Sequence, residues 1–342
     1  MRARVIGGAL SLIFIAITIS QVDLGEFATA LGQGQYAWVV PAALVTAVGY
    51  VLRGARWNQI VGRGGFASRW DSYSALLIGF AANNVFPLRL GEVVRAYVAA
   101  RHSSRRKTFF LATIVVERIL DGIVLVGILA LASYLTPLPA GGREIQLLVT
   151  ILFASAAFAV WMLARAESHS LALLRWLLRA APARVARGLD VRLQSFLAGF
   201  AQLRRPADLA RLLLFSVLIW CCELTSYALI IHAFGVTFSG LTALAAPAVL
   251  LAAVNFSTMI PSAPGYVGVF HLTGVAALAI FGVSKESALA IATVSHAIQY
   301  LLVTSAGLVM LGREHLSLRS VSKAAIEGDE IDTAGLRVAP SA

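Results

Sequence analysis

Charged residues and cysteines are scarce in this chain of 342 residues. Asp, Glu, Lys and Arg together make up 13% of the positions, about half of the share that soluble globular domains carry. The two cysteines, Cys221 and Cys222, are adjacent inside an apolar run, so they offer neither the spacing of a zinc or redox site nor a long-range disulfide. With 59% hydrophobic residues and a mean hydropathy of +0.81, this scarcity of charge excludes a soluble protein.

Several motifs of nucleotide and hydrolytic chemistry are also missing. The sequence contains no G-x-x-x-x-G-K-[ST] or G-x-G-x-x-G phosphate loop, no H-E-x-x-H and no G-x-S-x-G. It also lacks a D-D-x-x-D cluster, the usual acidic pattern for holding a metal. We therefore expect no ATP-driven pumping by this chain alone, no enzymatic activity, no cofactor and no metal.

Long apolar runs dominate what is present. A helix needs about 20 apolar residues to cross a bilayer, and six runs of that kind occur near 5–22, 35–52, 108–136, 145–164, 212–234 and 287–311. Three further apolar stretches are interrupted or bounded by Asn, Pro and Gly, and they lie near 72–88, 241–260 and 266–283. The sequence therefore predicts an all-α integral membrane protein with six full transmembrane helices as its baseline.

The net charge of +11 comes from loops, not from the apolar runs. Lys and Arg accumulate in the cytoplasmic loops of membrane proteins. Here they gather at Arg2 and Arg4, and in the ranges 53–69, 101–107 and 165–211, whereas the opposite loops are almost bare of them. This distribution indicates a membrane topology and not a nucleic-acid surface. It predicts a multi-pass protein of the bacterial inner membrane with both termini in the cytoplasm.

The same charge rule applies to the interrupted stretches. Both flanks of 71–100 are rich in Arg, whereas both flanks of 241–283 are poor in charge. Each segment should therefore return to the membrane face from which it entered. We expect two re-entrant helical hairpins, one opening inward and one outward.

The expected domain organisation is one polytopic membrane domain over 1–316, followed by a disordered cytoplasmic tail over 317–342. Within the membrane domain, 165–211 is a cytoplasmic basic segment. It reads either as an amphipathic stretch on the inner membrane surface or as an ordinary positive loop. The first 30 residues also fit a signal peptide with an Ala28-Thr29-Ala30 cleavage site. The sequence leaves open whether the first span is retained.

Two interrupted segments share a pattern that indicates an internal repeat. Each has a helix-like run with Asn, then Pro, then Gly within a few residues, and then a second helical stretch. Broken segments at matching positions in two halves point to the central site of a transporter, because broken backbone at membrane depth needs protein or a water-filled cavity around it. The alternative is that Pro and Gly only end tight turns between spans. The residues concerned are Asn84, Pro87, Asn255, Pro261, Pro264, Gly265 and Gly268.

Six charged residues lie inside or beside apolar runs, in two groups with helical spacing: Arg89, Glu92, Arg95, Glu117, Arg118 and Asp121. An ionised side chain at bilayer depth costs about 2.5 to more than 10 kcal/mol unless it is paired or hydrated. One interpretation is a buried salt-bridge network in which three acids balance three bases. The other is a cavity in which Arg side chains bind the phosphate of an anionic headgroup.

Two further residues complete the candidate translocation site. Glu223 is a lone acid in the run at 212–234, and it reads as a proton or cation site or as the partner of an Arg from the network. His271 follows Gly265 by six residues, and His296 lies in the last run. A lone His on an apolar face is more often a packing residue than a ligand, so a proton role is the less favoured interpretation for either histidine.

Three motifs in this order resemble the lysylphosphatidylglycerol synthase transmembrane region family, also called the flippase-like domain family. They are NVFPLRLGEVVR at 84–95, VERILD at 116–121 and PSAPGYVG at 261–268. In multidomain relatives this region is understood to translocate aminoacylated phosphatidylglycerol, while a separate cytosolic domain performs the synthesis. Other relatives are linked to glycosylation or to hopanoid lipids. The resemblance implies that the six charged residues and the break at 261–268 lie in a lipid-handling cavity.

The sequence ends at residue 342 without a synthase domain, so we expect a stand-alone member of the family. Which lipid it handles is not determined by the sequence. Our hypothesis is a flippase that moves an anionic or aminoacylated phospholipid, or a lipid-linked headgroup, between leaflets through a polar intramembrane cavity. The alternatives are a small-solute or ion secondary transporter and an intramembrane transferase acting on a polyprenyl phosphate. The expected partners are membrane lipids and no nucleic acid. A homo-oligomer and a separately encoded synthase or glycosyltransferase stay open.

Overall fold

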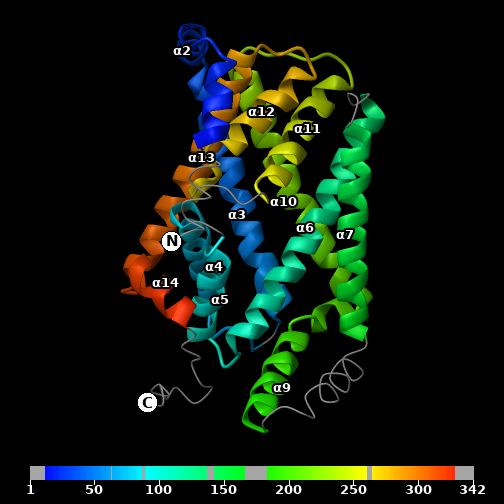
Figure 1. Ribbon diagram of the computed structural model, residues 1–342, viewed down its shortest axis with the longest axis vertical. Helices are drawn as coiled ribbons and strands as arrows, with labels where there is room; N and C mark the ends of the chain where they lie inside the picture. The colour runs from blue at the N-terminus through cyan, green and yellow to red at the C-terminus, as the bar shows by residue number, and fades with distance from the viewer. Residues whose placement is uncertain are drawn as a thin grey trace.

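The computed structural model describes residues 12–62, 64–86, 89–136, 142–165, 183–259 and 264–327, and all regular structure in these ranges is helical (Figure 1). This confirms the predicted all-α class. After a first helix, Leu12–Ser20, the elements are α2 Leu24–Gly32, η1 Tyr36–Trp38, α3 Val39–Val61, α4 Arg69–Val85, α5 Gly91–Arg101, α6 Lys107–Leu135, α7 Gly142–Arg165, α9 Ala183–Ala198, η3 Ala201–Arg204, α10 Pro206–Ala233, α11 Thr242–Ser257, η4 Pro264–Tyr266, α12 Val269–Ala279, α13 Lys285–Arg313 and α14 Leu318–Glu327.

Several of these helices are long and apolar enough to cross a membrane. Within the described ranges four pass this test by themselves: Tyr36–Val61, Gln146–Leu163, Pro206–Ala233 and Lys285–Arg313. The first helix and α2 pass it only as a pair, and the chain bends by 89° between them. The described part of the chain therefore contains four membrane-capable helices, or five if the bent pair is one span, which agrees with a multi-pass membrane protein.

Helix α3 differs from the span expected at 35–52. It continues to Val61, so Arg53 and Arg56 lie inside the helix and not in a cytoplasmic loop. Both side chains are buried. The physical reason is that carboxylates of α6 and α10 lie within 4 Å of them, and a paired charge can be buried where an unpaired one cannot.

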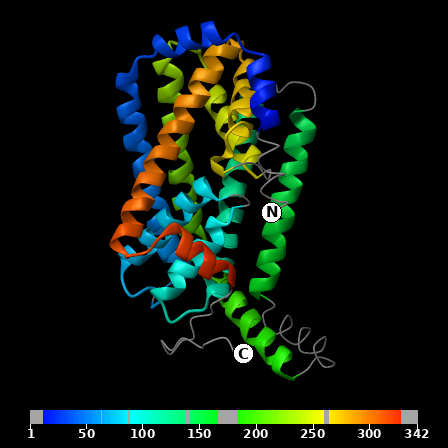
Figure 2. The ribbon, with the colours of Figure 1, turned by 60° about the vertical axis from the view of Figure 1, so that its left-hand side comes forward.

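Two pairs of consecutive helices form helical hairpins in opposite halves of the bundle. α4 and α5 pack against each other in the lower half of Figure 1, and α11 and α12 pack against each other in the upper half. Figure 2 shows the same arrangement from a second direction. The break of the second hairpin reaches the first, because η4 lies against α4. The sequence-predicted helices thus flank both breaks, while Pro87 and Pro261 themselves lie outside the described residues.

Two glycines allow the arms of the first hairpin to approach closely. A Cβ atom on Gly79 of α4 would lie 2.5 Å from the Cβ of Arg95 on α5, and a Cβ on Gly91 would collide with the carbonyl oxygen of Gly79. The backbone N–H of Gly91 donates to Oδ1 of Asn83 at 2.8 Å, which satisfies one of the free donors at the start of α5. These contacts fix the position from which α5 presents Arg95.

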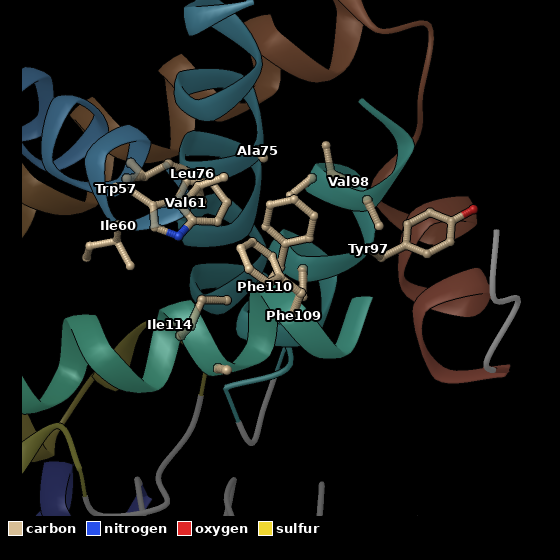
Figure 3. Packing of buried hydrophobic residues seen from close by; sticks show 14 of the residues in the cluster. Trp57, Ile60, Val61, Ala75, Leu76, Tyr97, Val98, Phe109, Phe110 and Ile114 are labelled. Atoms are coloured by element: carbon tan, nitrogen blue, oxygen red, sulfur yellow. The ribbon is translucent and has the colours of Figure 1, made fainter. Parts of the chain in front are cut away.

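An apolar core joins this hairpin to α3 and α6 (Figure 3). Trp57 of α3 is fully buried, and its ring lies 6.1 Å from that of Phe110 on α6. The indole Nε1 donates to Oγ1 of Thr113 at 3.0 Å, so the polar atom of the buried ring has its partner. Leu76 of α4 and Val98 of α5 complete the cluster around it. This packing therefore holds α5 and α6, and with them their charged residues, in a defined position relative to α3.

Only the first part of the tail expected to be disordered over 317–342 is described, and it is helical, while 328–342 lie outside the described residues. Residues Leu318–Glu327 form α14, which packs against α5, and Val321 is buried. Apolar side chains three positions apart, at Leu318 and Val321, give this short helix one face that joins the core. Of the basic segment expected at 165–211, the structure describes α9, which packs against α6.

Candidate functional site

A cavity of about 140 Å³ lies where the two hairpin breaks meet α3, α6, α10 and α13. Its wall combines aromatic rings, side-chain amides and charged groups, a mixture that suits a ligand with both polar and apolar faces. The lining residues are Tyr50, Arg53, Phe80, Asn83, Asn84, Arg89, Arg118, Trp220, Glu223, Asn255, Thr258, Tyr266, Phe270, His296, Gln299, Tyr300 and Val303.

Arg89 lines the cavity and forms no ion pair with a described residue. It lies in the break of the first hairpin with a φ of 54°, a left-handed conformation that non-glycine residues rarely adopt. Its Nε donates to the Tyr266 hydroxyl over a long 3.4 Å, and its guanidinium lies 5.9 Å from the centre of that ring. Among the described residues no carboxylate lies within 4 Å of Arg89. Its positive charge therefore faces the cavity without a counter-ion from this part of the chain.

Arg95 and Glu117 form a buried pair behind the cavity wall. Two nearly parallel hydrogen bonds join them, from Nη1 to Oε1 at 2.8 Å and from Nη2 to Oε2 at 2.9 Å. The Arg95 guanidinium also lies 3.8 Å from the centre of the Trp57 ring. Both partners are almost inaccessible, at 1% and 0% exposure. This bidentate arrangement pins α5 to α6, and Arg95 is buried behind the residues that line the cavity.

A second buried pair joins α3 to α6 and α10. Arg56 donates from Nη1 to Oδ1 of Asp121 at 2.5 Å and to Oγ of Ser216 at 2.7 Å. The indole of Trp220 donates to the same Asp121 oxygen at 3.1 Å. Arg56 also lies 3.7 Å from Glu117, so the two buried pairs form one continuous network.

Arg53 and Glu223 bring the network to the cavity wall. Their Nη2 and Oε1 atoms are 3.4 Å apart, and Arg53 lies 3.6 Å from Asp121. The other oxygen of Glu223 accepts from Nε2 of Gln299 at 3.3 Å. Glu223 therefore pairs with an Arg, as one alternative from the sequence had it, but that Arg is Arg53 and not one of the three predicted for the network. Its carboxylate already has two neighbours at the wall.

Arg118 and Glu92 form the loosest pair. Nε of Arg118 lies 3.3 Å from Oε1 of Glu92, but neither atom has a hydrogen bond of acceptable geometry to a described residue. Arg118 is 32% exposed and lines the cavity, whereas Glu92 does not. Across the described residues the network therefore balances four acids with four bases, and Arg89 is one further positive charge. The expected balance of three and three lacked Arg53, Arg56 and Glu223 and counted Arg89 inside the network.

The second break contributes backbone and imidazole groups. Gly265 has a φ of 69° and lies so close to Tyr300 that a Cβ would come within 2.7 Å of the ring. Gly268, with a φ of 92°, precedes α12, and its N–H donates to Nδ1 of His271 at 3.4 Å. The rings of His271 and His296 lie 5.1 Å apart. His271 therefore caps α12, and His296 is the imidazole that reaches the cavity.

The structure sorts the sequence-predicted site residues into two groups. Those that line the cavity are Asn84, Arg89, Arg118, Glu223 and Asn255. Those that lie beside or behind it are Glu92, Arg95, Glu117, Asp121, Pro264, Gly265, Gly268 and His271. The salt-bridge network and the cationic cavity site, which were the two interpretations of the sequence, thus occur side by side in different residues.

Two Arg residues of the site were missed because they were assigned to a loop. Arg53 and Arg56 follow an apolar run of sufficient length for a span, and the charge rule favours ending the span there. The helical signal continues, however, since Trp57 and Ile60 fall at i+4 and i+7 from Arg53. Testing whether apolar residues continue the same helix face beyond the first Arg would have found both.

Comparison with known proteins places this geometry in context. The family model described as lysylphosphatidylglycerol synthase TM region matches residues 4–307. The glycosyltransferase AglD of Haloferax volcanii is 26% identical over 326 residues, which cover 87% of this chain and 52% of AglD. A UPF0104 membrane protein of Methanocaldococcus jannaschii is 27% identical over 115 residues, covering 33% of this chain and 34% of that protein. The chain thus spans about half or less of these relatives. No solved structure matches significantly.

Proposed function

Because the chain belongs to the lysylphosphatidylglycerol synthase transmembrane region family, we propose that it moves a phospholipid or lipid-linked phosphate between the leaflets of the membrane. The headgroup passes through the cavity at the hairpin breaks while the acyl chains stay in the lipid. The lipid leaves chemically unchanged, so the chain acts as a flippase and not as an enzyme. The observation that carries this proposal is Arg89, a cavity-lining guanidinium without a carboxylate partner among the described residues.

The charge balance of the site explains why a phosphate would enter. The paired network is neutral, so the empty cavity attracts anions chiefly through Arg89. A guanidinium binds phosphate oxygens bidentately and is more weakly hydrated than an ammonium group. Arg118 is the second contact, because its poorly aligned bond to Glu92 can be exchanged for a bond to the phosphate.

The dimensions of the helices support six crossings and two re-entrant hairpins. At 1.5 Å per residue, the 29 residues of α6 extend about 43 Å, enough to cross despite their four charged residues. The 17 residues of α4 and the 16 of α11 extend about 25 Å each, short of the roughly 30 Å hydrocarbon core. We place the hairpins on opposite faces as an inverted repeat, with both termini in the cytoplasm of a bacterial cell.

The first experiment measures leaflet exchange of labelled lipids in proteoliposomes. Arg89→Gln keeps the size and polarity of the side chain but removes its charge. We expect exchange of an anionic phospholipid to fall at least about tenfold, while exchange by Arg69→Gln, a matched change at an exposed site outside the cavity, stays at the wild-type level. Equal exchange by both variants would remove Arg89 from the lipid path. Wild-type exchange no faster than in empty liposomes would reject passive flipping.

A second candidate function comes from the relative named glycosyltransferase. In that case the cavity holds a polyprenyl phosphate sugar as a transferase substrate, and Arg89 binds its phosphate during transfer. This candidate predicts that detergent-solubilised protein forms product from a labelled sugar lipid and an acceptor. Exchange in liposomes without any product would decide for the flippase.

A further inference from the structure

The lining of the cavity carries information about the part of the headgroup beyond its phosphate. Resting on the proposed function, we infer that the site takes a lipid phosphate that bears an uncharged polyhydroxyl group, such as inositol or a hexose, and discriminates against an aminoacyl headgroup with its ammonium charge. The state of the wall's carboxylate argues against an ammonium group, and its amides and aromatic rings suit a neutral polyhydroxyl group.

The carboxylates leave no place for an ammonium group. Among the described lining residues Glu223 is the one acid, and both of its oxygens have neighbours, Arg53 at 3.4 Å and Gln299 at 3.3 Å. A lysyl group would bring positive charge into a cavity that already contains Arg89. To form an ion pair, the ligand would have to displace Arg53 from Glu223 and leave it without that partner in a desolvated site, which is unfavourable.

The amides supply the hydrogen bonds that neutral hydroxyls need. Asn84 uses Nδ2 to donate to Oγ1 of Thr304 at 2.9 Å, and Asn255 uses Nδ2 to donate to the Leu251 carbonyl at 2.8 Å. Within the described residues the Oδ1 atom of each has no partner. Asn83 is the complement, because its Oδ1 accepts from a backbone N–H and its Nδ2 has no described partner. The wall thus offers uncharged acceptors and an uncharged donor, and each hydroxyl can donate and accept.

Aromatic rings provide the surfaces for the carbon skeleton of such a group. Six of them line the cavity: Tyr50, Phe80, Trp220, Tyr266, Phe270 and Tyr300. A polyhydroxyl ring carries its hydroxyls at the rim and C–H bonds on its faces, so a pocket of rings with a few placed amides matches both parts. With Arg89 at the phosphate, the wall is complementary to a phosphorylated polyol both in the position of its charge and in its polarity.

The test compares exchange rates of lipids with different headgroups in the same proteoliposomes: phosphatidylinositol, a polyprenyl phosphate hexose, phosphatidylethanolamine and lysylphosphatidylglycerol. We expect at least one of the two polyol lipids to exchange about tenfold faster than the lysyl lipid, because an unpaired charge in a desolvated site is strongly rejected. Which of the two is faster distinguishes an inositol lipid from a glycosyl carrier lipid.

The variant Asn84→Asp sharpens this test. An aspartate at this position can accept from the Thr304 hydroxyl, so the local hydrogen bond is kept while a carboxylate is added to the wall. We expect the preference for polyol lipids over the lysyl lipid to shrink in this variant. The matched change Asn58→Asp, in α3 and outside the cavity, should leave the preference unchanged.

Each outcome separates the headgroup inference from the proposed function. Exchange of the lysyl lipid as fast as that of both polyol lipids overturns the inference and leaves flipping intact. Absence of exchange for every lipid, combined with uptake of free inositol phosphate, overturns lipid flipping and supports the polyol chemistry for a soluble ligand. Binding gives an independent readout if a variant inserts poorly: glycerophosphoinositol should raise the Tm of the purified protein more than glycerophosphoethanolamine. The reverse order would also overturn the inference.

Discussion

The two hairpins share a shape but are held by different interactions. The α4–α5 hairpin carries Arg89, Glu92 and Arg95, and through the latter two it is ion-paired to α6. The α11–α12 hairpin contains no Asp, Glu, Lys or Arg from Thr242 to Ala279. It packs through small residues instead, as at Gly274, where a Cβ would lie 2.8 Å from the Cβ of Ala292 on α13.

This difference shows two ways of fixing broken helices in a membrane protein. Close packing of small residues gains dispersion energy wherever backbones can approach, but it does not place charge. Ion pairs place charge at defined atoms, and they require every partner because an unpaired buried charge is costly. The charged hairpin therefore positions guanidinium groups at the site. The uncharged hairpin forms the opposite part of the cavity wall.

The largest loss of stability is expected when an ion pair of the charged hairpin, α4–α5, is broken. Arg95→Leu leaves Glu117 buried without its bidentate partner, which should lower the free energy of unfolding by about 3–5 kcal/mol. Denaturant unfolding in detergent measures the loss. Arg95→Leu with Glu117→Leu removes both charges, and Arg56 keeps its bond to Asp121, so this double variant should recover most of the stability. A double variant as unstable as the single one would mean that lost packing, not unpaired charge, causes the effect.

The next largest loss of stability is expected when steric overlap disturbs the packing of the uncharged hairpin, α11–α12. Gly274→Val introduces side-chain atoms where Ala292 already lies, and overpacking of this kind costs about 1–3 kcal/mol. Thermal unfolding of the purified protein checks this. Gly127→Ala in α6 is the control, because no atom lies within 4 Å of its Cβ position, and it should be neutral or slightly stabilising. Equal destabilisation by both changes would contradict the role given to close packing.

A smaller effect concerns the cap of the uncharged hairpin. His271→Ala removes the acceptor for the Gly268 N–H and should cost up to about 1 kcal/mol, as loss of a helix cap does. His271→Gln should cost less, since a Gln three residues into a helix can reach back to the same N–H. Thermal unfolding of the two variants ranks them, and the reversed ranking would reject the capping role.

The smallest effect on stability is expected at Arg89, although the proposed function predicts that Arg89→Gln has the largest effect on lipid exchange. Arg89→Gln breaks no carboxylate pair among the described residues, so its free energy of unfolding should stay within about 0.5 kcal/mol of the wild type. Arg95 and Arg89 are the same residue type in one hairpin, and their opposite behaviour separates a structural from a ligand-binding Arg. A large loss of stability in Arg89→Gln would erase that distinction.

The fold class and the position of both breaks were predictable because they depend on local properties. Apolar runs of span length and Pro or Gly between helix-like runs are visible along the chain, and both hairpins follow from them. The bent first pair was not predicted, since Asp23 caps α2 through its own side chain and starts a new helix direction. Helix α14 was missed because it is short and lies in a polar sequence, so its few apolar residues give no clear helical pattern.

The site was predictable only in part, because charge along the chain does not identify pairs. The acids at 92, 117 and 121 were predicted to be intramembrane charges, but Arg53 and Arg56, which pair with the acids at 117 and 121, resembled ordinary loop residues. The lining residues Tyr50, Trp220 and Gln299 carry no local signal, since aromatic and amide side chains are common in spans. Their roles depend on which helices are neighbours.

The sequence by itself determined that this protein is an all-helical membrane protein with two broken segments and charges near the first of them. Hydropathy and backbone preferences are summed over neighbouring residues, so they can be read without a fold. Only the tertiary structure decided which charge stays available. Four bases meet four acids through contacts between residues up to 170 positions apart, and Arg89 is left facing the cavity because pairing depends on distances of a few ångströms in space.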